Sequence, residues 1–179
     1  NEHLIFVGTA VRLYTQRFQS TPQPKQTMSY LKEKRNFLNK LHNNVFSEVL
    51  HRSSSNPKLF IDDKRYIKQY FPDIVNLEKH FDEYLLKSKL LVLDHPGTTL
   101  NKALAANIPT IAFWEDAHWP MCSEADQLFK LLQDAGILCT NGEEAAQKVN
   151  KIWGDVNGWW QQDQIQNVRK VWSNKYART

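Results

Sequence analysis

The chain has 179 residues, of which 41% are hydrophobic and 23% are charged, a balance typical of one globular domain with a substantial buried core. No stretch approaches the ~18 consecutive apolar residues of a membrane-spanning helix, and the start of the chain lacks the basic and apolar segments of a signal peptide. The formal charge of +4 is spread along the chain, which argues against a nucleic-acid-binding surface and mildly favours an anionic ligand.

The first half of the chain alternates short apolar runs with helical patterns. Leu31, Leu38 and Leu41 repeat near one face of a helix, while the mixed-sign charges of residues 32–35 predict a solvated face. Residues 45–51 alternate in side-chain character as a strand does. The elements expected here are a strand at 3–9, a polar loop at 18–27, a helix at 29–41, a strand at 45–51, a polar loop at 53–58, a helix at 64–70, a short strand at 74–77 and a helix at 81–88.

The second half contains the clearest unit, a strand, a turn, a helix and a second strand. This order predicts a right-handed βαβ crossover between parallel strands. The expected elements are a strand at 90–93, a turn at 94–97, a helix from Thr98 to about 107, a strand at 109–114, a helix at 122–134 capped by Gly136, a strand at 137–139, a helix at 143–153, a break at 154–158 and a final helix at 159–176. The whole pattern predicts an α/β, doubly wound, Rossmann-like parallel sheet of about six strands.

The chain is expected to form a single domain over residues 1–179. An apolar strand that begins by residue 4, without an initiator methionine, suggests the C-terminal fragment of a longer chain. The tryptophan-rich helix at 155–179 is expected to pack on this domain or on a partner domain. Cys122 and Cys139 lie far apart and outside any metal or redox spacing, so both are expected to be free thiols in a reducing cytoplasm.

The loop at residues 94–99 is the strongest candidate site, because ligands of open parallel sheets bind at the carboxyl ends of the strands. Gly97 allows close approach of the backbone, and the free amides and dipole at the start of the following helix suit a phosphate group. A plain capped turn is the structural alternative. No Walker loop and no G-x-G-x-x-G after the first strand are present, which weighs against a classical NAD site. The candidate residues of this loop are Asp94, His95, Pro96, Gly97, Thr98 and Thr99.

Three more loops are expected on the same edge of the sheet. Gly8 and Thr9 follow the first strand, and His51 and Arg52, which can hold a phosphate or serve a structural role, end the second. The loop at 114–119 offers indole rings for stacking on a sugar or base, and carboxylates and an imidazole for acid–base chemistry. No further ligand cluster accompanies it, so no metal site is expected. Its candidate residues are Trp114, Glu115, His118 and Trp119, with Asp116 beside them.

The sequence from Leu93 to Leu100, together with Ala103–Trp114, resembles the C-terminal domain of GT-B-fold glycosyltransferases. It is most similar to a bacterial family of transferases of surface-carbohydrate biosynthesis clusters. The opening 6–9, the tail 144–160 and the end 176–178 also resemble that family. The resemblance covers most of the chain, most densely from residue 90 onward, and residues 18–80 carry little of it.

The resemblance implies one half of a GT-B architecture, with a nucleotide-sugar donor held in the cleft that faces an N-terminal domain. That second domain would bind the carbohydrate acceptor and often supplies the catalytic base, so the catalytic residues stay unknown. The donor would be linked to CMP, UDP or GDP, and no cofactor would be required, because helix-terminal amides commonly hold the phosphates in this fold. The protein would work in the cytoplasm, with peripheral association at the inner face of the membrane as an option.

The resemblance also implies roles for several individual residues of this chain. Thr98 and Thr99 would contact the donor phosphate. His51 and Arg52 would take the place of the basic phosphate-binding motif of CMP-sugar-using transferases. Gly8 and Thr9 would admit the donor to the first loop. Many GT-B members carry a glutamate two or three residues after the hydroxyl pair, where this chain has Leu100-Asn101-Lys102. A lysine cannot accept a hydroxyl hydrogen bond, so three alternatives stay open: the donor is held differently, Lys102 meets a phosphate, or activity has been lost.

Two other functions stay open at this point. A polyol-phosphate transferase or a sugar epimerase would use the same fold and the same phosphate loop. A catalytically silent binding or assembly module would explain Lys102 as decay and the tryptophan-rich tail as a docking surface.

Overall fold

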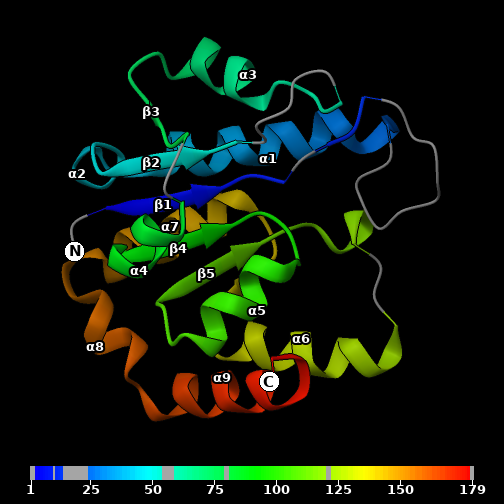
Figure 1. Cartoon of the computed structure of the whole chain (residues 1–179), viewed down its shortest axis with the longest axis vertical. Helices are drawn as coiled ribbons and strands as arrows, with labels where there is room; N and C mark the ends of the chain where they lie inside the picture. The colour runs from blue at the N-terminus through cyan, green and yellow to red at the C-terminus, as the bar shows by residue number, and fades with distance from the viewer. Residues whose placement is uncertain are drawn as a thin grey trace.

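The computed structural model describes residues 3–9, 11–13, 24–53, 59–78, 81–119 and 122–177 (Figure 1). The strands are β1 (Leu4–Val7), β2 (Val49–Arg52), β3 (Val75–Asn76), β4 (Leu90–Leu93), β5 (Thr110–Phe113) and β6 (Leu138–Cys139). The helices are α1 (Thr27–Lys40), α2 (Asn43–Phe46), α3 (Asp63–Tyr70), α4 (Phe81–Lys87), α5 (Thr98–Ala105), α6 (Ser123–Asp134), α7 (Gly142–Ile152), α8 (Val156–Trp160) and α9 (Asp163–Tyr176), with the short 3-10 turns η1 (Pro24–Gln26), η2 (Asp116–His118) and η3 (Trp153–Asp155).

The strands form one six-stranded parallel sheet in the order β3-β2-β1-β4-β5-β6, which confirms the predicted doubly wound architecture. Leu4 of β1 pairs with Val49 on one side and with Leu90 on the other. Every residue of β1, β4 and β5 is buried, because a parallel sheet with helices on both faces has no solvated side.

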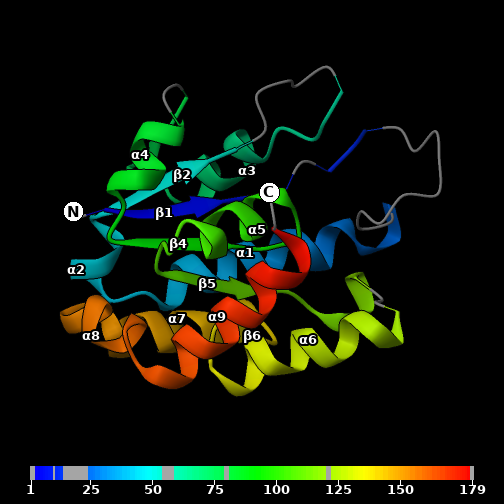
Figure 2. The same cartoon turned by 60° about the horizontal axis from the view of Figure 1, so that its bottom comes forward.

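Helices cover both faces of the sheet. α1 and α7 pack against each other on one face, and α5 lies on the other, where it packs against the C-terminal helix α9 (Figures 1 and 2). Gly142 allows the close approach of α1 and α7, since a Cβ there would lie 3.0 Å from the Phe37 amide nitrogen. Phe37 in turn stacks on Phe113 and packs at a tilted angle against Phe6 in the core.

The predicted strand at 45–51 is wrong in its first half. Residues 43–46 form the helical turn α2, in which the amides of Val45 and Phe46 both donate to the carbonyl oxygen of His42. The alternation of Val45, Ser47 and Val49 resembles the pattern of a strand. In the structure the helical turn buries Val45 completely, and β2 begins only at Val49.

The final helix is also divided differently from the prediction. Residues 156–160 form α8 instead of a break, because the carboxylate of Asp155 caps the helix by accepting from the Gly158 amide at 2.8 Å. α9 then begins at Asp163. Trp159, which was expected to start the last helix, lies within α8. Trp160 ends α8 and donates from its indole to Asn107 Oδ1 at 2.9 Å.

The remaining elements agree with the prediction to within a few residues at their ends. Gly136, expected as the cap of α6, has a φ of 69°, a conformation that glycine adopts without strain. The expected loop at 18–27 lies outside the described residues up to position 23, and only its end is seen, as η1 and the start of α1. Residues 54–58 of the other polar loop also lie outside them. No helix in the described part of the chain is long and apolar enough to cross a membrane.

Candidate functional site

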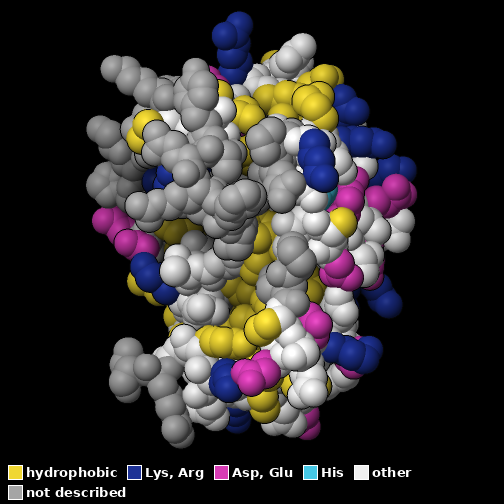
Figure 3. All heavy atoms as spheres, turned by 90° about the vertical axis from the view of Figure 1, so that its right-hand side faces the viewer, with side chains coloured by type: hydrophobic (Ala, Val, Ile, Leu, Met, Phe, Trp, Pro, Cys, Tyr) yellow, Lys and Arg dark blue, Asp and Glu magenta, His cyan; other side chains and the backbone are white. Residues whose placement is uncertain are grey.

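The direction of the strand order reverses between β1 and β4, and the loops that follow these two strands lie side by side at the carboxyl edge. Such a reversal leaves a crevice in which doubly wound proteins bind their ligands. The loop at 8–9 forms one wall and the loop at 94–97 the other. Figure 3 looks onto this edge of the molecule and shows hydrophobic side chains gathered in a hollow at its middle.

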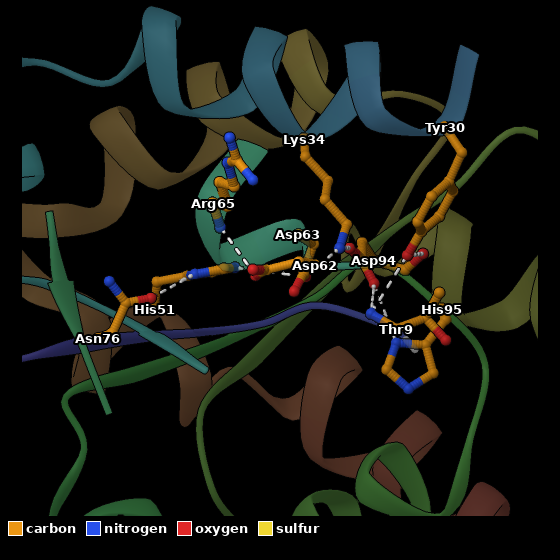
Figure 4. Close-up of polar contacts among 10 residues, drawn as sticks. All are labelled: Thr9, Tyr30, Lys34, His51, Asp62, Asp63, Arg65, Asn76, Asp94 and His95. Atoms are coloured by element: carbon orange, nitrogen blue, oxygen red, sulfur yellow. Dashed lines mark hydrogen bonds and ion pairs between the residues drawn. The ribbon is translucent and has the colours of Figure 1, made fainter. Parts of the chain in front are cut away.

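A buried ion-pair cluster forms the floor of the crevice. The ammonium group of Lys34, on α1, lies 2.8 Å from Asp63 Oδ2 and 3.3 Å from Asp94 Oδ2. Figure 4 shows Lys34 reaching down from α1 toward both carboxylates. The Lys34 side chain is 0% exposed, and both aspartates are almost fully buried. Gly8 runs directly over this cluster, where a Cβ would clash with the ammonium group.

The charges of Asp94 and Lys34 are fixed over the physiological pH range. Burial by itself would raise the pKa of Asp94, but Lys34 and His95 outweigh it and lower that pKa from 3.8 to about 2. Burial would likewise lower the pKa of Lys34, but Asp94 and Asp63 together raise it. At neutral pH Asp94 is therefore an acceptor only, and Lys34 is an ammonium ion.

Asp94 also joins the two walls of the crevice. Its Oδ1 accepts from the Thr9 amide at 2.8 Å, so the loop after β1 is tied to the loop after β4. The Thr9 amide also lies 3.3 Å from the hydroxyl oxygen of Tyr30, on α1. Burial and the nearby Asp94 carboxylate raise the pKa of Tyr30 well above 10.0, which keeps the phenol protonated.

His95 is the member of this cluster that reaches solvent. Its Nδ1 lies 3.0 Å from Asp94 Oδ1, and its side chain is 16% exposed. Because Asp94 is a carboxylate, Nδ1 must carry the hydrogen and Nε2 is left for another partner. The ring packs against Trp119, with 6.5 Å between centroids.

The N-terminus of α5 opens beside His95. Gly97 precedes the helix in an extended conformation that any residue adopts, so glycine is needed here for space and not for its backbone freedom. A Cβ at Gly97 would lie 3.0 Å from His95 Cδ2 and 3.2 Å from its Nε2. Thr98 and Thr99 form the first turn of the helix, and Lys102 is exposed one turn later. This combination of helix amides, hydroxyls and imidazole suits an anion.

An apolar pocket of about 200 Å³ adjoins this helix start. Aromatic rings from α6 and α9 form its far wall, so a group attached to an anion at the helix N-terminus has an aromatic surface within reach. Its lining includes Pro96, Gly97, Leu100, Phe129, Trp172 and Tyr176.

The structure does not bring His51 and Arg52 to the surface of the crevice. The His51 side chain is 0% exposed, its Nδ1 lies 3.2 Å from Asn76 Oδ1, and burial lowers its pKa. The Arg52 guanidinium donates to the carbonyl oxygens of Leu77 and Glu78 at 3.0 and 2.8 Å. In this conformation His51 ties β2 to β3, and Arg52 ties β2 to the residues that follow β3.

The loop at 114–119 packs against the fold more than it faces solvent. Trp114, His118 and Trp119 are all buried. Glu115 accepts from the Ser29 hydroxyl at 3.1 Å and lies 3.6 Å from His118 Nε2. These contacts attach the loop to α1. Within the described residues, no group of three or more histidine, cysteine or acidic side chains could hold a metal ion.

We did not predict Lys34, Asp63 or Tyr30 from the sequence, and the solvated face expected at residues 32–35 is wrong for Lys34, which is buried. A signal was present: Lys34 lies on the apolar stripe of α1, three residues after Leu31 and four before Leu38. A lysine on a buried stripe requires carboxylate partners, and Asp94 follows a buried strand at the same edge of the sheet.

The chain belongs to the LIC12162 family of transferases. The model of that family matches residues 1–179, so the crevice described above lies within a transferase domain. A search of curated proteins found no match.

Proposed function

We propose that this LIC12162 family domain binds the nucleoside phosphate part of an activated sugar donor, with the donor phosphate at the N-terminus of α5. One observation carries the proposal: at the β1–β4 crossover, a glycine-preceded helix start and a histidine held by a buried aspartate face the same space. The transferase family and the position of the crevice in a doubly wound sheet both support it.

The proposed reaction is glycosyl transfer in the biosynthesis of surface polysaccharides, with this domain as the donor-binding half of a GT-B enzyme. The helix amides and the hydroxyls of Thr98 and Thr99 would stabilise the negative charge that develops on the departing nucleoside phosphate. The donor would be linked to CMP, UDP or GDP and would need no metal. The carbohydrate acceptor would be held by a second, N-terminal domain, at the inner face of the membrane.

A calorimetric titration against CMP, CDP, UDP, GDP and ADP, without and with Mg²⁺, tests this function. We expect selective binding of one nucleotide that does not depend on Mg²⁺ and that Thr99→Val weakens about tenfold, by loss of a hydroxyl donor to a charged oxygen. Thr140→Val, on the loop after β6, is the matched control and should bind as the wild type does. Equal loss in both variants, or binding that requires Mg²⁺, would contradict the proposed site.

A further inference from the structure

The ion-pair cluster in the floor of the crevice has an excess of carboxylates as long as His95 is neutral. Among the described residues of this cluster there are two carboxylates, Asp63 and Asp94, and one ammonium group, Lys34, which gives a formal charge of −1. Protonation of His95 would bring the cluster to neutrality. The imidazolium would also point a charged N–H toward the space where the phosphate is proposed to lie.

We propose that His95 acts as the proton donor to the leaving phosphate, with Asp94 as its positioning residue. This inference rests on the proposed function and assigns a chemical role that the binding of a donor alone does not require. Asp94 Oδ1 accepts from Nδ1–H at 3.0 Å, which orients the ring and stabilises the imidazolium, while Nε2 is the ring nitrogen directed to the start of α5.

The proposed step conserves atoms and charge. The bond between the sugar carbon and the phosphate oxygen breaks, and its electron pair stays on that oxygen. The oxygen takes the proton of His95 Nε2, and the new bond forms between the sugar carbon and the acceptor hydroxyl oxygen. The proton of that hydroxyl passes to solvent, from which His95 is protonated again.

The groups that surround His95 come from its own loop, from α1 and from the loop that ends at Trp119. Asp94 contacts Nδ1 of the ring. Lys34 and Tyr30, both on α1, contact Asp94 in turn, and the uncharged ring of Trp119 packs against one side of His95. His118, beside Trp119, has its own partner in Glu115. Trp119 is uncharged, so Asp94 is the charged side chain that contacts the His95 ring, at Nδ1.

The test uses sulfate, which stays a dianion between pH 5.5 and 8.5 and so separates the protonation of the protein from that of the ligand. Binding is followed by the amide shifts of residues 97–100 in ¹H–¹⁵N NMR spectra. We expect the wild-type chain to bind sulfate about tenfold more tightly at pH 5.5 than at pH 8.5, on either side of the range in which histidines ordinarily titrate. His95→Gln should abolish that difference. His42→Gln, an exposed histidine before α2, should leave it unchanged.

A second measurement does not depend on whether His95→Gln folds. Long-range ¹H–¹⁵N spectra of the wild-type chain at pH 8.5 should show neutral His95 with its hydrogen on Nδ1. Hydrogen on Nε2, or a pH dependence of sulfate binding that survives in His95→Gln, would overturn the inference. If nucleotides bind and Thr99→Val weakens them while His95→Gln has no effect, the proposed function stands and the proton-donor role fails. If neither sulfate nor any nucleotide binds the wild-type chain, both fail.

Discussion

Replacing Lys34 by methionine removes the only ammonium group that the described residues place between Asp63 and Asp94, and it leaves two buried carboxylates without compensation. Methionine fills a similar volume, so the loss is electrostatic and not a loss of packing. Removing one partner of a buried ion pair costs about 3 to 5 kcal/mol. For a domain of this size, that loss corresponds to a decrease in Tm of about 6 to 20 °C.

The assay is thermal and urea unfolding at pH 7, where the lowered pKa of Asp94 and the raised pKa of Lys34 keep both groups charged. Lys32→Met is the matched control, because Lys32 is exposed on the same helix and its loss should change stability by about 0.5 kcal/mol or less. Adding Asp63→Asn to Lys34→Met should recover part of the loss, with a coupling of about 0.5 to 3 kcal/mol. Equal effects of Lys34→Met and Lys32→Met would refute a charged, stabilising floor.

Three further predictions concern the space above the buried ion pair, the pH dependence of stability and the reactivity of the two thiols. Gly8→Ala places a methyl group against the buried ion pair and should destabilise the domain by about 1 to 3 kcal/mol. Gly154→Ala, where a Cβ meets nothing within 4 Å, should change the urea midpoint little. The pKa of Asp94 is lowered to about 2, so its stabilisation is complete above pH 3.8 and is lost as pH falls through 2. Wild-type stability should therefore fall by about 2 kcal/mol across that window, and a fall of equal size in Asp94→Asn would contradict this. Burial raises the pKa of Cys139 to about 12 while Cys122 is exposed, so a thiol reagent at pH 7.5 should modify Cys122 alone in the folded chain, as mass spectrometry can check.

The sheet could be predicted because its strands are continuous apolar runs. Residues 90–93 and 109–114 are flanked by turns and separated by one helix, a pattern with few alternatives. The error at 45–48 arose because a period of two over four residues does not distinguish a strand from a single helical turn. β2 pairs with β1 only from Val49 onward, directly after this turn. That pairing is a tertiary contact, so the local sequence does not indicate where the strand begins.

The candidate site was predicted in part. The turn at 94–97 and the helix start at Thr98 were recognised because they follow a buried strand and combine glycine with hydroxyl residues. The pairing of Asp94 with His95 is local and could have been proposed from their adjacency. Lys34 lies 60 positions away, in a run whose composition resembles a solvated face, and only its helical phase marked it as buried.

His51 and Arg52 show that the position of a residue can be predicted when the direction of its side chain cannot. A histidine and an arginine at a strand end were candidates for holding a phosphate, with a structural role as the alternative, and the strand end is where the structure has them. Their side chains, however, engage Asn76 and the carbonyl oxygens that follow β3. The direction of a side chain at a strand end depends on its neighbours in the folded chain, which the sequence does not specify.

The central claim, that a nucleotide phosphate binds at the start of α5, is tested most directly by mapping amide shifts in ¹H–¹⁵N NMR spectra. The nucleotide with the highest affinity in the calorimetric titration is compared with its unphosphorylated nucleoside. The account predicts that the nucleotide shifts the amides of residues 97–100 and of Thr9 most strongly, and that the nucleoside leaves them unchanged. Largest shifts at any other loop of the sheet, or equal shifts at 97–100 with the nucleoside, would contradict it.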